Sequence, residues 1–158
     1  LLGLIFWCRK HKANLWKWVD CMSVAIPFGY TFGRIGNFMN GELYGRITTA
    51  PWGVIFAKTG ITVPCHPAQL YESMAYLVIF IVIIFLYKRF RNKVGSGLFS
   101  GFTLFTIFTF RFFIEYIKEV QVDFENGMLI NMGQILSIPL IIAGGYLIYR
   151  SFRWKAVR

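Results

Sequence analysis

The densest group of polar side chains lies between residues 33 and 46, directly after an apolar stretch. The segment reads Gly-Arg-Ile-Gly-Asn-Phe-Met-Asn-Gly-Glu-Leu-Tyr-Gly-Arg. Arginine forks match phosphate oxygens in a bidentate way, and an Asn amide both donates and accepts hydrogen bonds. Glycine permits tight turns and close approach of the backbone to a ligand. The segment is therefore a candidate anion site at lipid headgroup depth; the alternative is a solvated loop with turn glycines.

A second candidate lies inside a later apolar run. Arg111 is followed one helical turn on by Glu115, with Lys118 a further turn along. If a helix spans residues 95–117, Arg111 lies about 9 Å from its outer end at 1.5 Å per residue. A charge at such depth costs about 2.5–3.5 kcal/mol on insertion scales, so it needs a partner or a function. Two interpretations stay open: Arg111 binds a phosphate, or an Arg111–Glu115 pair joins helices.

The composition places these candidates in a membrane protein. Hydrophobic residues make up 56% of the chain and charged residues only 15%, against about 25% charged in soluble domains. Four stretches approach the roughly 20 residues that a bilayer span needs, at residues 15–32, 67–87, 95–117 and 128–149. Residues 1–8 are too short to span, and we interpret them as part of a cut helix. We expect an all-α, polytopic transmembrane bundle, with residues 1–158 forming one domain of a larger protein.

The basic residues predict an orientation. They follow the cut helix, the second full span and the last span, so alternating spans put all three clusters on one side. The positive-inside rule makes that side, and the C-terminus, cytoplasmic. Segment 33–66 is then outside, and it is too apolar for disorder, so we expect a folded arm at the outer membrane interface. The basic clusters are Arg9, Lys10 and Lys12; Lys88, Arg89, Arg91 and Lys93; and Arg150, Arg153, Lys155 and Arg158.

Several other classes of function are disfavoured. A net charge of +10 would suggest a nucleic-acid partner in a soluble protein. Here the basic residues follow span ends, so we expect no nucleic acid. The three cysteines have no CxxC spacing, which argues against a metal site or a disulfide framework. They are Cys8, Cys21 and Cys65.

Small residues indicate where helices cross closely. Gly97 and Gly101 have the GxxxG spacing, and Gly144 and Gly145 lie in the last apolar run. Such residues let two backbones approach each other. We expect crossings inside this bundle rather than a dimer face.

The segment at residues 33–45 resembles the defining motif of the prolipoprotein diacylglyceryl transferase family. The matching pattern is Gly-Arg-Ile-Gly-Asn-Phe-x-Asn-Gly-Glu-x-x-Gly. Three further pieces resemble the family in the same order and extend the match over essentially the whole chain. They are His-Pro-Ala-Gln-Leu-Tyr-Glu at 66–72, Arg-Phe-Phe-Ile-Glu-Tyr at 111–116 and Met-Gly-Gln-Ile-Leu-Ser-Ile-Pro at 132–139.

The resemblance implies a cofactor-free transferase of the bacterial plasma (inner) membrane. Such an enzyme moves the diacylglyceryl group of phosphatidylglycerol to the lipobox cysteine of a prolipoprotein signal peptide, and releases glycerol phosphate on the outer face. The thiol, of pKa ~8.5, must lose a proton, and the departing phosphate needs fixed cations. The resemblance assigns catalysis to Arg34 and Arg111. It assigns substrate binding to Arg34, Asn37, Asn40, Glu42, Gly45, His66 and Glu115.

The match has two departures. The family's essential histidine lies in a His-Gly-Gly stretch upstream of residues like Leu1, so we expect residues 1–158 alone to be inactive. His66 belongs to a different motif, where a structural or capping role before Pro67 is expected. Ile107 occupies the place of a family tyrosine. The alternatives are a non-catalytic lipid-binding or transport protein and a purely structural bundle, although a transporter would favour broken helices with midplane sites.

Overall fold

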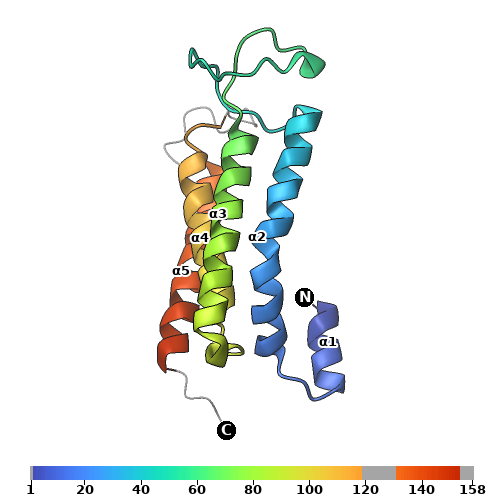
Figure 1. Ribbon diagram of the computed structural model, residues 1–158, viewed down its shortest axis with the longest axis vertical. Coiled ribbons are helices and arrows are strands. Elements are labelled where there is room, and N and C mark those ends of the chain that lie inside the picture. The colour runs from blue at the N-terminus through green and yellow to red at the C-terminus, as the bar shows by residue number, and fades with distance from the viewer. Residues whose placement is uncertain (1, 119–130, 154–158) are drawn as a thin grey trace.

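The computed structural model describes residues 2–118 and 131–153, which form a helical bundle topped by an irregular arm (Figure 1). Within these residues the backbone forms α-helices, two short 3-10 helices and isolated β-bridges, so the all-α prediction is confirmed for them. The elements are α1 (Leu2–Lys10), α2 (Leu15–Asn40), η1 (Ala57–Thr59), α3 (Ala68–Arg89), η2 (Arg91–Lys93), α4 (Leu98–Ile114) and α5 (Met132–Arg153).

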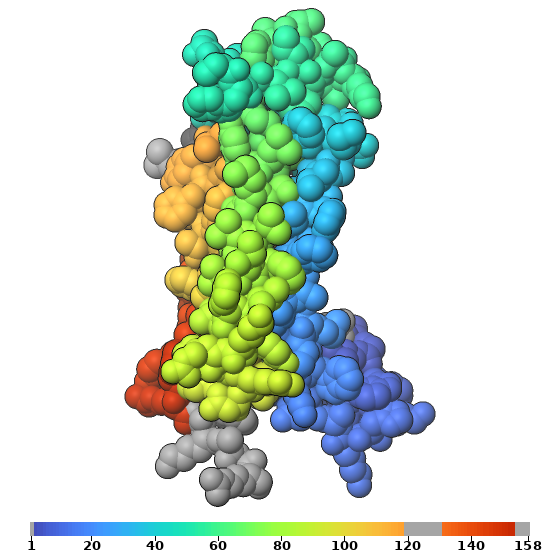
Figure 2. Space-filling model, in the orientation of Figure 1, coloured from blue at the N-terminus to red at the C-terminus, as the bar shows by residue number. Residues whose placement is uncertain are grey.

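The four long helices run side by side along the molecule (Figure 1). Helices α2 and α4 run toward the arm, whereas α3 and α5 run away from it. We call the end under residues 41–67 the arm end and the opposite end the basic end, because the basic residues closing α1, α3 and α5 lie there. The three predicted basic clusters therefore share one end, although Lys155 and Arg158 lie outside the described residues. The space-filling view shows the arm covering the arm end (Figure 2).

Glycines set the crossing of α4 and α5. A Cβ added to Gly101 would lie 2.8 Å from the Leu147 side chain, and one added to Gly144 would lie 2.6 Å from the Phe105 nitrogen. The predicted close crossing is thus confirmed for these two glycines. Gly97 serves a different purpose, because its φ of 87° lets the chain turn into α4.

Two of the described helices, α3 and α5, are long and apolar enough to cross a membrane. Helix α4 is also apolar but has 17 residues. Large apolar side chains on these helices point outward, among them Val78, Phe85, Phe113 and Ile142. Extended exposed apolar surface of this kind suits lipid better than water.

Helix α2 is longer than the sequence predicted. The expected span ended at Phe32 and left the motif in a loop, but the helix continues to Asn40. Gly41, with a φ of 75°, ends it: its amide and that of Glu42 donate to the carbonyls of Phe38 (3.1 Å) and Asn37 (2.9 Å), a C-terminal cap. The expectation that the motif glycines make turns is therefore right for Gly41. It is wrong for the two earlier glycines, which are helical.

A buried carboxylate joins α2 to α4 at the basic end. Asp20, which is fully buried, accepts hydrogen bonds from the amides of Gly95 (2.9 Å), Gly97 (3.0 Å) and Ser100 (3.0 Å). The Ser100 hydroxyl donates a fourth bond at 2.7 Å. These are the amides that precede and open α4, so Asp20 caps one helix from another.

Candidate functional site

At the arm end, three segments converge on a second buried carboxylate, that of Glu72 on α3. Arg34 of α2 pairs through Nε with one Glu72 oxygen, and Lys118, beyond α4, pairs through Nζ with the other. The side chains of Glu72, Lys118 and Arg34 are only 1%, 6% and 11% exposed. Charges so buried are tolerated when they are paired.

The buried face of α3 explains why Glu72 lies there. Gln69, Glu72, Ser73 and Tyr76 follow the i, i+3, i+4, i+7 spacing of one helix face, and all four are buried. The Ser73 hydroxyl donates to the Thr31 carbonyl at 3.2 Å, which holds this face against α2. A polar face inside an apolar helix thus presents Glu72 to its neighbours.

Backbone contacts between the arm and the bundle position Lys118. Gly45 N donates to the His66 carbonyl (2.8 Å), and Arg46 N donates to the Ile117 carbonyl (2.9 Å). Arg46 Nε donates to the carbonyl of Lys118 itself at 3.1 Å. A Cβ on Gly45 would lie 2.8 Å from both His66 Cβ and the Ile117 oxygen. Gly45 therefore permits a close approach of three segments rather than the turn expected from the motif.

Arg111 reaches the same region from α4. Tyr76 is buried, and Arg34, Glu72 and Arg111 all lie close enough for their charges to act on its hydroxyl. Because α4 ends at Ile114 rather than Ile117, Arg111 is about 4.5 Å from the helix end at 1.5 Å per residue, shallower than predicted. We call Arg34, Glu72, Tyr76, Arg111 and Lys118 the Glu72 cluster. The two arginines predicted as catalytic are thus brought together.

Glu115 faces another way. A Cβ on Gly133 would lie 2.7 Å from a Glu115 carboxylate oxygen, so this carboxylate lies against the first turn of α5. That position suits a negative charge, because a helix N-terminus is electropositive. Among the described residues Arg111 and Glu115 form no salt bridge, so the alternative of an Arg111–Glu115 pair is not seen.

Three predicted site residues lie beyond Arg34, toward the end of α2. Asn37 is half-buried, whereas Asn40 and Glu42 are exposed. Their side chains make no hydrogen bond to the part of the chain that the structure describes. The Glu42 carbonyl accepts a bond from Gln69 Nε2 at 2.6 Å. These residues border the Glu72 cluster without joining it.

His66 connects the arm to α3. Its Nδ1 lies 3.2 Å from the Tyr71 hydroxyl, which accepts a bond from Trp52 Nε1 at 2.8 Å. In the neutral ring the Tyr71 hydroxyl can therefore donate to His66 Nδ1. The expected cap is not observed: Pro67 is the N-cap residue of α3 and no side chain caps that helix.

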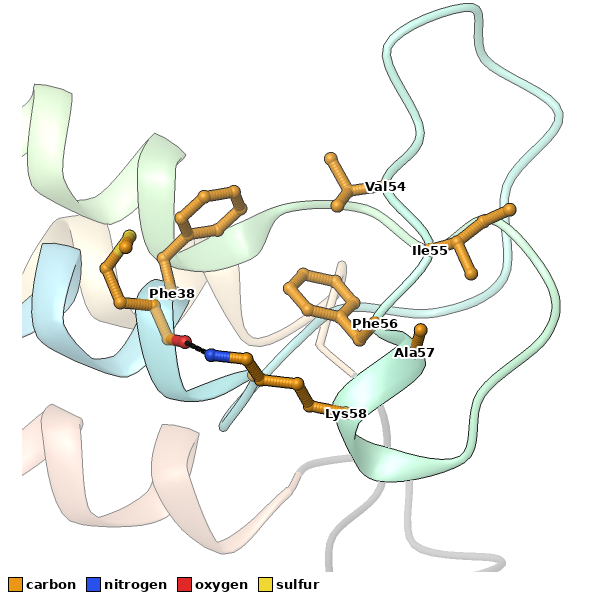
Figure 3. Close-up of a pocket in the computed structure, with 8 residues that line it drawn as sticks. Phe38, Val54, Ile55, Phe56, Ala57 and Lys58 are labelled. Carbon is orange, nitrogen blue, oxygen red and sulfur yellow. Dashed lines mark hydrogen bonds between the residues drawn. The ribbon is translucent and has the colours of Figure 1, made fainter.

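The arm encloses an apolar pocket one helical turn beyond Arg34 (Figure 3). It has a volume of about 280 Å³ and is lined mainly by Phe38, Val54 and Phe56. The rings of Phe38 and Phe56 pack edge to face, with their centroids 5.8 Å apart. Lys58 Nζ, at the rim, donates to the Met39 carbonyl at 3.4 Å. Apolar surface and one cation thus lie about one helical turn beyond Arg34.

Sequence reasoning missed Glu72 as a site residue, and treated Lys118 only as a neighbour of Glu115. The signal was present, because Glu72 is an acidic residue within the predicted span 67–87. An ionisable residue in a span needs a partner or a function. The same rule that singled out Arg111 would have identified Glu72.

The fold and the site together define a helical membrane protein with a buried ionic cluster at one end of its bundle. The family model described as prolipoprotein diacylglyceryl transferase matches residues 1–150. The chain therefore belongs to the prolipoprotein diacylglyceryl transferase family.

Curated relatives agree with this assignment. Proteins named phosphatidylglycerol–prolipoprotein diacylglyceryl transferase are similar to this chain in Bacteroides fragilis (46% identity over 158 residues), Tolumonas auensis (40% over 158) and Rickettsia akari (41% over 157). The alignments cover 100%, 99% and 96% of this chain, and 57%, 60% and 59% of those relatives. The chain thus spans somewhat more than half the length of the relatives it matches.

Proposed function

We propose that this chain belongs to an enzyme that transfers the diacylglyceryl group of phosphatidylglycerol to the lipobox cysteine of a prolipoprotein. The observation that carries the proposal is the Glu72 cluster, to which Arg34 and Arg111 come from different helices. Family membership and the names of the relatives support the choice of substrates. The cluster contains three cations and the single carboxylate of Glu72, so a phosphate would balance the remaining charge.

The proposed reaction is a displacement at a glycerol carbon. The cysteine thiolate forms a C–S bond while the C–O bond to the phosphate breaks, and the electron pair of that bond leaves with glycerol phosphate. Arg34 and Arg111 stabilise the charge that develops on the phosphate oxygens. We propose that the thiol proton goes to a base outside residues 1–158, in the His-Gly-Gly stretch that the family resemblance places upstream of residues like Leu1.

Glu72 and Lys118 have supporting roles in this proposal. The ion pair uses Nε of Arg34, one of the five N–H donors of a guanidinium. Glu72 thereby fixes the direction of the Arg34 fork, and Lys118 balances the charge of Glu72. Asn37, Asn40 and Glu42 remain proposed contacts for the substrates, whereas Glu115 and His66 are proposed to position neighbouring segments.

We also propose that α2, α3, α4 and α5 cross the bacterial inner membrane, with the basic end and the C-terminus cytoplasmic and the arm at the outer interface. The shared end of the basic clusters supports this orientation. Exposed Ile47, Trp52 and Ile55 support an arm that touches the headgroup region. In a cysteine-labelling scan of intact cells, positions in 41–60 should react from outside, and positions in 89–93 only after permeabilisation. Labelling of 89–93 from outside would reverse the orientation.

A lipid-binding or transport protein would use the same arginines without chemistry. The cluster lies at one end of unbroken helices rather than at their middle, which favours the enzyme. The full-length protein in vesicles should convert phosphatidylglycerol and a lipobox peptide into two products, the thioether-linked peptide and glycerol phosphate. Binding of phosphatidylglycerol without release of glycerol phosphate would contradict the enzymatic proposal.

A further inference from the structure

A groove of about 340 Å³ lies between α2 and α4, below the Glu72 cluster. Its walls are largely apolar: α2 contributes Val19, Ile26 and Tyr30, and α4 contributes Leu104, Ile107 and Phe108. A volume above about 300 Å³ with mostly apolar walls is typical of small-molecule sites.

The groove leads to the two arginines. Arg34 lies four residues after Tyr30 on α2, and Arg111 lies four residues after Ile107 on α4, so each arginine is one turn further along the same helix face. Tyr30 also contacts Tyr76 of the Glu72 cluster, with ring centroids 5.6 Å apart. The apolar walls and the cations therefore form one continuous surface.

The two arginines lie at the same height above a common floor. Helices α2 and α4 run in the same direction (Figure 1), and the Ser23 and Ser100 hydroxyls are 3.2 Å apart. Arg34 and Arg111 each lie eleven residues beyond these serines. Eleven residues of helix span about 16 Å, close to half of the ~30 Å hydrocarbon core, which is the depth of one leaflet.

The floor of the groove is polar and fixed. The Ser23 hydroxyl donates to the Val19 carbonyl at 2.7 Å, and that of Thr103 donates to the Ser23 carbonyl at 3.1 Å. The Ser100 hydroxyl donates to the fully buried Asp20 at 2.7 Å. These hydroxyl protons are already used in hydrogen bonds inside the protein. The floor is therefore held in place.

We propose that this groove binds one acyl chain of the phospholipid donor and that the Ser23–Ser100 floor limits the length of chain that fits. The groove matches a phospholipid in charge and in length. The arginines at its outer end suit a phosphate, and its apolar walls, one leaflet deep, suit a hydrocarbon chain. This proposal rests on the proposed function, because it assumes that the lipid phosphate binds at Arg34 and Arg111.

A rival groove of about 460 Å³ lies between α3 and α4, and its lining includes Ala75 and Val78. It provides a matched control. Ile26→Phe adds bulk to the α2–α4 groove on the arginine side of the Ser23–Ser100 floor, and Val78→Phe adds bulk to the rival. Both variants are made in the full-length protein and assayed in mixed micelles with dilauroyl and dioleoyl phosphatidylglycerol.

For Ile26→Phe we expect the ratio of kcat/KM for the short-chain lipid to that for the long-chain lipid to rise at least about tenfold, the usual discrimination for small differences in an apolar pocket. Val78→Phe should leave the ratio unchanged. An unchanged ratio in folded Ile26→Phe, or the same shift in Val78→Phe, would overturn the proposal.

A second measurement does not depend on transfer. Phosphatidylglycerol with a diazirine at the end of one acyl chain should crosslink, in the unaltered protein, to peptides containing Ser23 or Ser100. Crosslinking to the Ala75–Val78 peptide instead would assign the chain to the rival groove. Crosslinking at the floor without any transfer would uphold the groove and contradict the proposed reaction alone.

Discussion

The two ends of the bundle each bury a carboxylate, and the two carboxylates are satisfied in different ways. At the basic end Asp20 accepts four hydrogen bonds, three from backbone amides and one from a hydroxyl. At the arm end Glu72 pairs with two charged side chains, Arg34 and Lys118. The partners of Asp20 belong mainly to the backbone, whereas those of Glu72 are two cationic side chains whose remaining N–H donors can bind a ligand.

This difference separates a structural charge from a functional one. A carboxylate held by helix-opening amides stabilises a helix terminus and has little capacity left for a ligand. A carboxylate paired with two long cationic side chains holds their positive charge in a buried region of low dielectric constant. There the positive charge acts strongly on a bound anion. We therefore assign stability to Asp20 and substrate chemistry to the Glu72 cluster.

The largest expected effect is that of Arg34→Ala. Transfer should fall by about 10²–10³, the usual cost of losing one fixed donor to developing charge. Stability should fall as well, by less than the about 3–5 kcal/mol of a buried charge that loses its only partner, because Lys118 still pairs with Glu72. Arg34→Lys should restore transfer only in part, since a point charge lacks the bidentate fork.

Two variants separate these effects. Arg34→Ala combined with Glu72→Gln and Lys118→Met removes all three buried charges, so much of the stability should return while transfer stays low. Arg150→Ala at the basic end should leave transfer near the wild-type rate. If the triple variant recovers transfer together with stability, Arg34 has a structural role only.

The opposite pattern is expected for Asp20→Asn. The amide nitrogen of Asn cannot accept hydrogen bonds, so about two of the four are lost and unfolding should become easier by about 1–3 kcal/mol. Transfer per folded molecule should stay close to the wild-type value. Chemical unfolding in bicelles and transfer at matched folded protein measure the two quantities. If Asp20→Asn lost most of its transfer activity without losing stability, Asp20 would have a functional role as well.

A smaller effect is expected for Gly45→Ala. The new Cβ would meet His66 and the Ile117 carbonyl at 2.8 Å, so the join that positions Lys118 must open slightly. Gly29→Ala is the control, because a Cβ there meets nothing within 4 Å and Ala is the better helix former by about 1 kcal/mol. Thermal unfolding should show loss for Gly45→Ala and no loss for Gly29→Ala. Equal unfolding temperatures for the two variants would show that the close contact at Gly45 does not stabilise the arm.

The sequence predicted the helices, because they depend on local periodicity. The placement of Arg34 and Arg111 in one site came from the family motif, and their roles there remain a prediction. The sequence did not predict that α2 would include residues 33–40, since glycine-rich sequence favours turns and only packing overrides this. The buried carboxylate of Asp20 was not predicted. Its four donors come from residues 95–100, and such distant contacts cannot be found from a single sequence. The partners of Glu72 were missed for the same reason, because they lie 38 residues before it and 46 residues after it.

The most direct test of the account is Arg111→Ala in the full-length protein. Arg111 forms no salt bridge within the described residues, so its removal leaves no buried carboxylate unpaired there and the rate reports function alone. Transfer of labelled diacylglycerol to a lipobox peptide should fall by about 10²–10³ while the unfolding midpoint stays unchanged. Near-normal transfer, with less folded protein in the membrane, would show that Arg111 only supports the bundle and would contradict the assignment of the Glu72 cluster as the phosphate site.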